Sequence, residues 1–355
     1  MQTRYSELLL KTIARIAPGT ELREGLERIL RGRTGALIVL GSDKTVTSIS
    51  SGGFSIDTEF SATRLRELAK MDGAIICNRE GTRLLHAAVQ LSPDTSIDTN
   101  ESGTRHRTAE RVAIQTGFPV ISVSASMSVI SVYVDGTRYT VESTQYLMSR
   151  ANQAIQTLES YTRRLSTVLT ELSSMEIEST VTITNVALTL QRMEMVRRII
   201  AEVSHYVLEL GVNGRLVSLQ LEELRNPESS TSDIILRDYL PDANELTIAA
   251  AQQALENLDD MDIVDLKTVA RVVGFDDIDM EAPLHPRGYR LLDGIPTMPR
   301  AITERMVERF GSLQALMAAS LEDLRAVEGV GEQRARTIRE SLSRMAESSL
   351  EKFLY

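Results

Sequence analysis

The apolar pattern of this chain changes once, near residue 145, and that change limits the folds it can adopt. Before it, apolar and β-branched runs at 36–41, 74–77, 83–91, 119–124 and 129–134 predict strands, some buried on both faces. Helical patterns lie between them, and Asp135-Gly136 predicts a two-residue hairpin. Beyond residue 145 the strand signals fade into long helical stripes. The sequence predicts an α/β domain with a central mixed sheet flanked by helices, then two all-α regions.

Length and composition set outer limits on the class of protein. The 355 residues suffice for two or three domains, and a hydrophobic content of 42% argues against disorder. The single cysteine, Cys77, excludes an internal disulfide framework, and packing within a strand is its expected role. No apolar run approaches the roughly 20 residues needed to cross a bilayer, and no signal peptide pattern opens the chain. We expect a folded, cytoplasmic protein that does not bind a membrane.

Residues 102–108 gather groups that bind phosphate. The charged and hydroxyl donors in this segment are Thr104, Arg105, Arg107 and Thr108. Gly103 precedes them and allows a ligand to approach the backbone closely. A helical apolar pattern follows and stops at Gly117, so the segment lies at a helix N-terminus, where free N–H groups favour an anion. The sequence predicts an anion site here.

Asp72-Gly73 precedes a predicted strand and supplies a carboxylate that this cluster lacks. Such a carboxylate could bind a divalent metal or orient a sugar hydroxyl, while the glycine lets the backbone approach a ligand. Each feature also has an ordinary structural explanation. Asp-Gly is a common turn dipeptide, the arginines could be solvated surface charges, and His106 could be a satisfied structural histidine.

Taken together, the segments Asp72-Gly73-Ala74 and 103–107 (Gly-Thr-Arg-His-Arg) resemble the signature of the diadenylate cyclase family. The resemblance implies condensation of two ATP molecules into cyclic di-AMP with release of two pyrophosphates, using Mg²⁺ or Mn²⁺. It implies that Asp72 holds the metal and the attacking hydroxyl, and that Arg105 and Arg107 bind phosphates and stabilise developing charge. The expected nucleotide-binding residues are Gly73, Leu91, Thr104, Arg105, His106, Arg107, Thr108 and Ser124.

The last seventy residues carry a second pattern. Gly329-Val330-Gly331 lies between two predicted helices and resembles the helix-hairpin-helix motif, whose bare N–H groups meet a DNA phosphate. The expected DNA-binding residues are Gly329, Val330, Gly331, Arg334 and Arg336. Residues 294–300 look like a divergent first copy in which proline removes backbone donors, so its DNA contact stays open. A helical protein-interaction module is the alternative.

Charge supports this division of the chain. From Arg287 onward there are eleven Lys and Arg against ten Asp and Glu, or +1, whereas the whole chain carries −10 and the rest therefore −11. DNA contact should then be local to the C-terminal region. The acidic stretch at 242–281 has no calcium-loop spacing and predicts a solvated helical face.

In this order, the segments resemble the DNA integrity scanning diadenylate cyclases of bacteria over essentially the whole chain. The resemblance implies a cyclase domain at 1–145, a helical linker at 146–286 and a tandem helix-hairpin-helix domain at 287–355. It also implies a cytoplasmic homo-octamer associated with DNA, with branched DNA such as Holliday junctions as partner. The competing hypothesis is a non-enzymatic DNA-binding scaffold whose nucleotide domain only senses ATP, and the intact Asp72, Arg105 and Arg107 argue against it.

Overall fold

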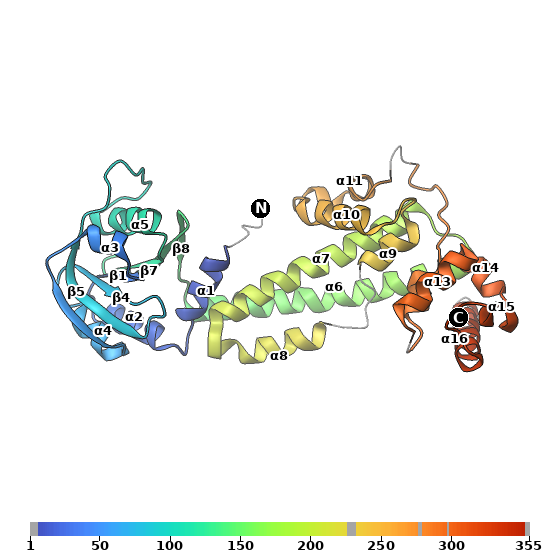
Figure 1. Ribbon diagram of the computed structural model, residues 1–355, viewed down its shortest axis with the longest axis horizontal. Coiled ribbons are helices and arrows are strands. Elements are labelled where there is room, and N and C mark those ends of the chain that lie inside the picture. Colours follow the sequence, from blue (N-terminus) through green and yellow to red (C-terminus); the bar gives the residue numbers. More distant parts are fainter. Residues whose placement is uncertain (1–5, 226–231, 276–278, 297, 352–355) are drawn as a thin grey trace. The chain divides into compact units, whose positions relative to one another are not determined.

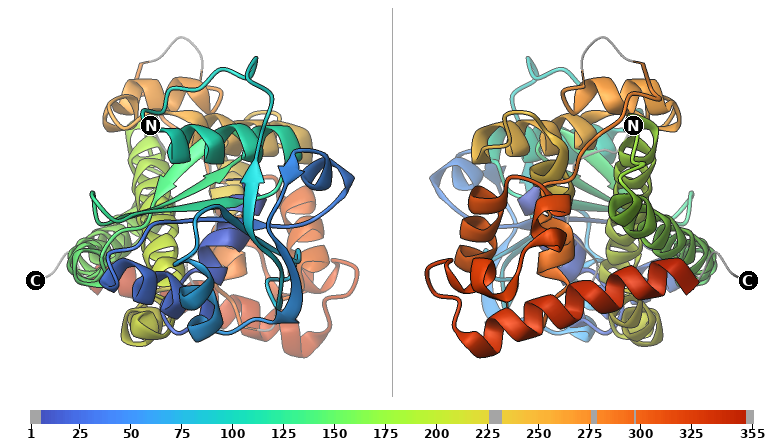
Figure 2. Two further views of the ribbon diagram at one scale, coloured as in Figure 1. Left: turned by 90° about the vertical axis from the view of Figure 1, so that its left-hand side faces the viewer. Right: turned by 90° about the vertical axis from the view of Figure 1, so that its right-hand side faces the viewer.

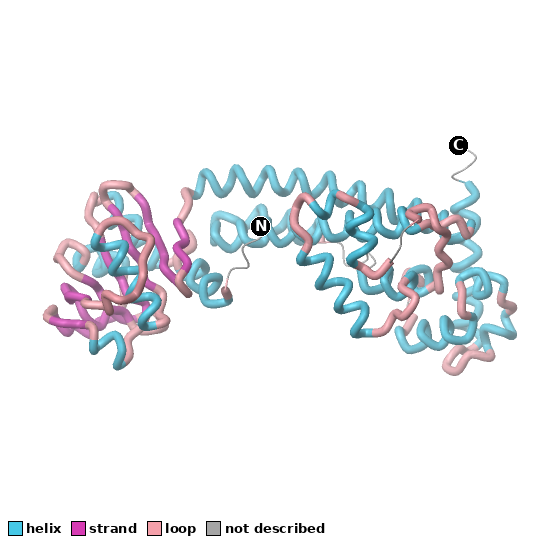
Figure 3. The backbone as a smooth tube through the Cα atoms, turned by 90° about the horizontal axis from the view of Figure 1, so that it is seen from above, coloured by secondary structure: helices cyan, strands magenta, loops and turns pink. Residues whose placement is uncertain are grey.

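The computed structural model describes residues 6–225, 232–275, 279–296 and 298–351 (Figure 1). These residues form two compact units. The first comprises 6–153 and 203–220, and the second comprises the described residues of 154–202 and 221–351. All described strands belong to the first unit (Figure 3). Residues 276–278 of the predicted acidic face, and Thr297 of the predicted first hairpin, lie outside the described residues.

The first unit is built on one sheet. Its strands are β1 (Ala36–Leu40), β2 (Ser50–Ser51), β3 (Phe54–Glu59), β4 (Ala74–Cys77), β5 (Arg83–Leu91), β6 (Val120–Ser124), β7 (Val129–Val134) and β8 (Thr137–Thr140). They lie in the order β2-β5-β4-β1-β6-β7-β8, with β3 paired to β5. The pair β1 and β4 is parallel, and the other pairs are antiparallel. The predicted mixed sheet is confirmed.

Helices cover both faces of this sheet (Figure 2, left). They are α1 (Glu7–Arg15), α2 (Glu21–Arg31), α3 (Lys44–Ser48), α4 (Ala62–Leu68) and α5 (Thr104–Thr116). In β1, Ile38 and Leu40 pack in the core with α1, α2 and α4, whereas Leu37 and Val39 pack with α3 and α5. Successive side chains of a strand point to opposite faces, so the continuous apolar run of β1 is buried on both sides, as predicted.

Two elements of this unit differ from what the pattern indicated. Helix α3 has the sequence KTVTS, which is rich in β-branched residues; it begins because Asp43 accepts the N–H of Val46 at 2.8 Å. Strand β3 lies beside β5 at the edge of the sheet, where Phe54 is 62% exposed, so no apolar alternation marked it. Local capping and pairing override weak propensity in both cases.

Long helices follow the sheet. They are α6 (Thr144–Glu178), α7 (Ile183–Leu210), α8 (Arg215–Leu224), α9 (Ser232–Tyr239), α10 (Glu245–Asn257) and α11 (Leu266–Val272), with 3-10 turns at Gly211–Gly214 and Asp262–Val264. In the second unit, Leu172, Leu190, Leu236, Ile248 and Val269 bring α6, α7, α9, α10 and α11 into one core. Helix α7 ends before Gly211, and that glycine has a positive φ of 51°.

The C-terminal helices have a core of their own. They are α12 (Tyr289–Asp293), α13 (Arg300–Phe310), α14 (Leu313–Ala318), α15 (Leu321–Arg325) and α16 (Glu332–Glu351), which is the long helix in the right-hand view of Figure 2. The pair α15 and α16, joined by a short turn, confirms the predicted hairpin. The fold class expected from the sequence is thereby confirmed: an α/β sheet domain followed by all-α regions.

A buried charged cluster fastens α12 to the linker helices. One carboxylate oxygen of Asp238 accepts the N–H groups of Gly288 and Tyr289, and the other accepts that of Arg290, all at 2.7 Å. The Arg290 guanidinium in turn pairs with Glu176, with Nε and Oε1 3.0 Å apart. Both partners are buried, so a desolvated ion pair joins α6 to α12.

Candidate nucleotide site and DNA interface

The topology brings the predicted nucleotide residues to one end of the strands, which we call the nucleotide edge of the sheet. Because β1 and β4 are parallel, with Leu37 opposite Ala74, both strands begin at this edge. Strands β5 and β6 run antiparallel to them and end there, so Leu91 and Ser124 are close to the edge at which Asp72-Gly73 enters β4. Residues more than fifty positions apart in the sequence, such as Asp72 and Ser124, thus share one rim.

Asp72 is exposed, and its carboxylate is largely free. Its Oδ1 accepts the N–H of the next residue, Gly73, at 3.0 Å, and no other hydrogen bond or ion pair from the described residues reaches the side chain. Gly73 has a φ of 106°, and a Cβ there would lie 2.7 Å from the carbonyl carbon of Ala88. Strand β5 therefore requires this glycine sterically, in addition to any approach by a ligand.

The N-terminus of α5 is open for an anion. Its N-cap residue, Gly103, has a φ of 89° and provides no side-chain cap, and the first turn carries no acidic residue. The first backbone hydrogen bond of the helix runs from Arg107 N–H to the Gly103 carbonyl at 3.1 Å. The N–H groups of the preceding turn, together with the helix dipole, remain available to a phosphate.

Arg105 and Arg107 are both exposed, and neither makes a hydrogen bond or ion pair with the described residues. Two positions along a helix correspond to about 200° of rotation, so the two side chains leave α5 on different sides. Arg105 lies against Gly35, where a Cβ would be 2.2 Å from its Nη1. Gly35 was not predicted as a site residue; its only signal in the sequence is a glycine directly before a buried strand.

His106 points into the protein between the two arginines. It is 7% exposed, and its Nδ1 lies 2.8 Å from the hydroxyl of Tyr133 on β7. Burial, followed by the nearby Arg138, lowers the pKa of His106, and burial raises the pKa of Tyr133. Both side chains are therefore neutral near pH 7, and the structure places His106 as a brace between α5 and the sheet.

The loop before α5 is tied down by contacts that the sequence did not indicate. Glu101 accepts two hydrogen bonds from Arg138 of β8, at 3.0 and 3.1 Å. Arg111 of α5 donates to the carbonyls of Ile97, at 2.8 Å, and Thr95, at 3.1 Å. These bonds fix the path by which the chain enters the first turn of α5.

Ser124 and Leu91 complete the rim. Ser124 is 7% exposed, with its hydroxyl 3.3 Å from that of Ser126. Leu91 is buried at the end of β5, in the core that also contains Val112 of α5. Leu91 thus contributes to the rim by packing in the core beneath it. The Ser124 hydroxyl could bond to a ligand if its contact with Ser126 is broken.

The side chains of the nucleotide edge could hold a metal ion only if the substrate also contributes ligands. Among the described residues there is no group of three or more His, Cys, Asp or Glu side chains that could hold a metal ion. Magnesium is commonly held by one or two carboxylates together with substrate phosphates, and Asp72 can play that part. The residues therefore fit a metal that arrives with a nucleotide.

The C-terminal hairpin departs in detail from its prediction. Gly329 carries the positive φ, 85°, whereas Gly331 does not, and a Cβ at Gly331 would meet no atom within 4 Å. Val330 is buried, and its N–H is bonded to the Val327 carbonyl at 3.1 Å. The space beside Gly331 is therefore open, and a phosphate could approach its backbone there.

The two predicted basic residues of the hairpin have partners within the protein. Arg334 Nη1 donates to the Gly329 carbonyl at 2.6 Å, and Arg336 pairs with Glu332 at 2.6 Å on the exposed side of α16. A cavity of about 310 Å³ beside Gly331 is also lined by Ile295 and Pro296. The divergent first hairpin therefore lies next to the second.

Comparison with protein families matches three consecutive parts of the chain. Residues 23–138 match the family described as "DisA bacterial checkpoint controller nucleotide-binding". Residues 141–281 match the "DisA bacterial checkpoint controller linker region", and residues 290–350 match the "Helix-hairpin-helix motif". The matched order is that of the cyclase, linker and hairpin regions expected from the sequence.

Curated relatives match almost the full length. The DNA integrity scanning protein DisA of Kineococcus radiotolerans is 57% identical over 347 residues, covering 97% of both chains. That of Acidothermus cellulolyticus is 57% identical over 348 residues, covering 97% of this chain and 95% of the relative. That of Streptomyces griseus is 52% identical over 353 residues, covering 98% and 94%. With a cyclase-type nucleotide domain and a helix-hairpin-helix region in place, the chain belongs to the DisA family of DNA integrity scanning proteins.

Proposed function

We propose that this chain condenses two ATP molecules into cyclic di-AMP and releases two pyrophosphates at the sheet edge that carries Asp72 and α5. One observation carries the assignment of these residues. That edge carries the exposed Asp72 carboxylate, which accepts only the Gly73 N–H, a helix N-terminus without a side-chain cap, and two arginines that pair with none of the described residues. Exposed charges without partners, beside free N–H groups, suit a highly charged ligand such as a triphosphate.

The reaction follows from the chemistry of the substrates. In each half, the 3′-hydroxyl of one ribose loses its proton to solvent and its oxygen bonds to the α-phosphorus of the other ATP, while the bond from that phosphorus to pyrophosphate breaks. Positioning and charge stabilisation should dominate, as in other transfers at phosphorus. Asp72 orients the attacking hydroxyl. Arg105, Arg107, Thr104 and Thr108 hold the phosphates, and a bound Mg²⁺ or Mn²⁺ would neutralise their charge.

The arrangement around α5 also bears on assembly. Because Arg105 and Arg107 leave the helix about 200° apart, they suit phosphates on different sides of the helix. The product is two-fold symmetric, which favours two subunits meeting face to face, each with one ATP. The symmetry requires only a pair of facing cyclase domains; the homo-octamer is what the family resemblance implies, and we include it in the proposal, to be tested by sedimentation with and without ATP.

The C-terminal hairpins form the proposed DNA surface. Gly331 gives a phosphate access to the backbone, and the flanking Arg334 and Arg336 add positive charge. Arg334 and Arg336 already have partners within the protein, so one module should bind DNA weakly. Tight binding then needs several modules on one branched DNA, such as a Holliday junction.

The same proposal assigns catalysis to residues 1–145, a linker to 146–286 and DNA binding to 287–355. It also places the protein in the cytoplasm. None of the described helices is long and apolar enough to cross a membrane. The test is incubation of the protein with ATP and Mn²⁺, followed by chromatography for a cyclic dinucleotide, with and without a four-way DNA junction. A protein that binds ATP and DNA but makes no product would instead be the ATP-sensing scaffold.

A further inference from the structure

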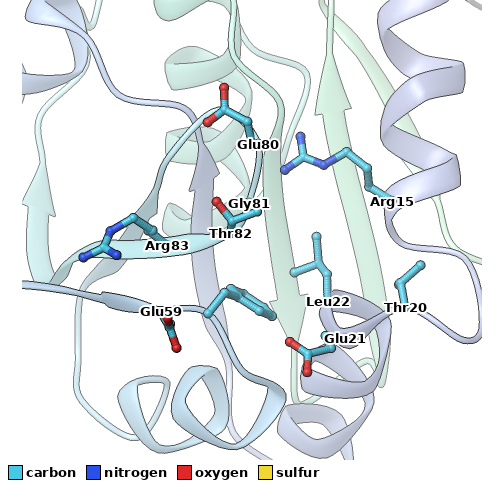
Figure 4. Close-up of a pocket in the computed structure, with 10 residues that line it drawn as sticks. Arg15, Thr20, Glu21, Leu22, Glu59, Glu80, Gly81, Thr82 and Arg83 are labelled. Atoms are coloured by element: carbon cyan, nitrogen blue, oxygen red, sulfur yellow. The ribbon is translucent and has the colours of Figure 1, made fainter.

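A polar cavity, whose lining is shown in Figure 4, lies where β5 begins, at the opposite end of that strand from the nucleotide edge. Its volume is about 640 Å³, and its walls come from α1, the start of α2, the end of β3 and the turn between β4 and β5. Arg83 lines it at the start of β5, whereas Leu91 reaches the nucleotide edge at the other end of that nine-residue strand. At about 3.4 Å per residue, the two ends are roughly 25 Å apart. This cavity is separate from the cyclase site.

The cavity holds a guanidinium without a hydrogen-bond partner among the described residues. Arg15 makes no hydrogen bond or ion pair with the described residues, and its buried Nη2 is unsatisfied. The side chain points toward Gly81 and Glu80 (Figure 4), and a Cβ at Gly81 would lie 2.3 Å from Nη2. Burial lowers the pKa of Arg15. A buried, unsatisfied guanidinium N–H is costly, and a carboxylate or phosphate is the partner that best relieves that cost.

Carboxylates face this arginine across the cavity. Glu21 and Glu59 are exposed, and their side chains have no hydrogen bond or ion pair with the described residues. Glu80 accepts a hydrogen bond from Asn78 at 2.9 Å, and Arg83 is committed to Asp57, with Nε and Oδ1 2.8 Å apart. Two arginines and three glutamates line the cavity, so its formal charge is −1. A simple anion would therefore satisfy Arg15 but would be repelled by the other walls.

Between these charges the lining is apolar, because Leu22 and Phe60 contribute to it. A matching ligand has an anionic group, at least one cationic group and a hydrocarbon stem between them. A free basic amino acid meets all three conditions, and its net charge of +1 complements the lining. We propose that the cavity binds such an amino acid, with its α-carboxylate on Arg15, its side-chain cation at Glu21 and Glu59, and its methylene stem over Leu22 and Phe60.

Isothermal titration of the full chain tests the ligand class, and its readout is independent of cyclase activity. The probes are L-lysine and L-arginine, with cadaverine lacking the carboxylate, L-norleucine lacking the side-chain cation, and GMP as a phosphate-bearing comparison. Lysine or arginine should bind saturably at up to millimolar concentration, and cadaverine and norleucine should bind at least about tenfold more weakly, since each loses a charge-assisted contact. Binding of GMP alone, or of no probe, would overturn the proposal.

Three variants place the site. Arg15→Met keeps the stem but removes the donors, and it should weaken amino-acid binding by about tenfold or more. Glu21→Gln, at an exposed position without contacts to lose, should weaken binding with the fold unchanged and decides the matter if Arg15→Met does not fold. Lys11→Met is the matched control, because Lys11 is exposed on the same helix and pairs with Glu7 at 2.5 Å. Equal affinity in Glu21→Gln and the unaltered chain would show that the amino acid binds elsewhere.

Discussion

The Nδ1 of His106 lies 2.8 Å from the hydroxyl oxygen of Tyr133, and this contact joins the arginine-bearing helix α5 to strand β7. Tyr133 is 1% exposed and His106 is 7% exposed, so the bond is shielded from bulk solvent. The pKa of His106 is lowered, mainly by burial, and that of Tyr133 is raised by burial, so both groups are uncharged near neutral pH. Under the proposed function, His106 influences nucleotide binding only through the positions of Arg105 and Arg107, because its ring is held against Tyr133.

Tyr133→Phe should leave the buried Nδ1 without a partner. The expected loss is about 1–3 kcal/mol in the free energy of unfolding, the cost of an unsatisfied buried polar group. Turnover should also fall, because α5 is held less firmly. Urea unfolding and cyclase kinetics measure the two effects, with exposed Tyr146→Phe as control. Normal turnover in a destabilised Tyr133→Phe variant would confine His106 to a structural role.

Asp72→Asn should abolish cyclic di-AMP formation while leaving the fold and much of the ATP affinity intact. The exchange is nearly isosteric, and Asn can still accept the Gly73 N–H, but the charge that a metal needs is gone. Asp57→Asn is the matched control, since Asp57 is exposed and pairs with Arg83 at the far end of β5. Product formation by Asp72→Asn at a rate close to that of the control would remove the metal role of Asp72.

Arg105→Ala and Arg107→Ala should each cost roughly 2–4 kcal/mol in the transition state, seen mainly in kcat. Gly35→Ala should act in the same direction, because its methyl group would displace the Arg105 guanidinium. Arg31→Ala serves as the control at an exposed arginine outside the site. Unchanged kinetics for Arg105→Ala would show that Arg105 is a solvated surface charge with no part in the reaction.

Much of the sheet domain could be predicted because its signals are local. The run of β1, the Asp135-Gly136 hairpin and the α5 stop at Gly117 each depend on a few adjacent residues. The motif residues Asp72, Arg105 and Arg107 could be recognised for the same reason. Contacts between distant residues could not be predicted, since nothing in the sequence indicates that Glu101 meets Arg138 or that Gly35 makes room for Arg105.

The linker shows the same limit more strongly. Its helices followed from apolar stripes, but the cluster of Glu176, Asp238 and Arg290 comes from three segments more than fifty residues apart in each case. Each residue alone has the pattern of a surface charge. Only the packing of α6, α9 and α12 shows that they are buried together.

Asp238 should make stability depend on pH. Burial, and then the charge of Glu176, raise the pKa of this carboxyl to about 7, against the opposing effect of three backbone N–H bonds. Since the ordinary pKa of an aspartate carboxyl is 3.8, the folded state holds a proton that the unfolded chain releases. The resulting stabilisation is full below the unfolded pKa and is lost as pH rises through about 7. Urea unfolding across this pH range should show that the difference in free energy of unfolding between the unaltered chain and Asp238→Asn shrinks as pH rises. A difference that stays constant with pH would contradict this role of Asp238.

Gly331→Leu should weaken DNA binding without unfolding the hairpin. The new side chain enters open space in the protein but blocks a phosphate from the backbone, whereas Gly329→Leu would strain a residue with a φ of 85°. Ser343→Leu, at an exposed position further along α16, is the control for added apolar surface. Binding of a four-way junction and a linear duplex would be measured at two salt concentrations for each variant. Affinity should fall by about 0.9 log units per phosphate contact for each tenfold rise in salt, and Gly331→Leu should reduce that slope. Junction binding by Gly331→Leu equal to that of Ser343→Leu would assign the DNA surface elsewhere.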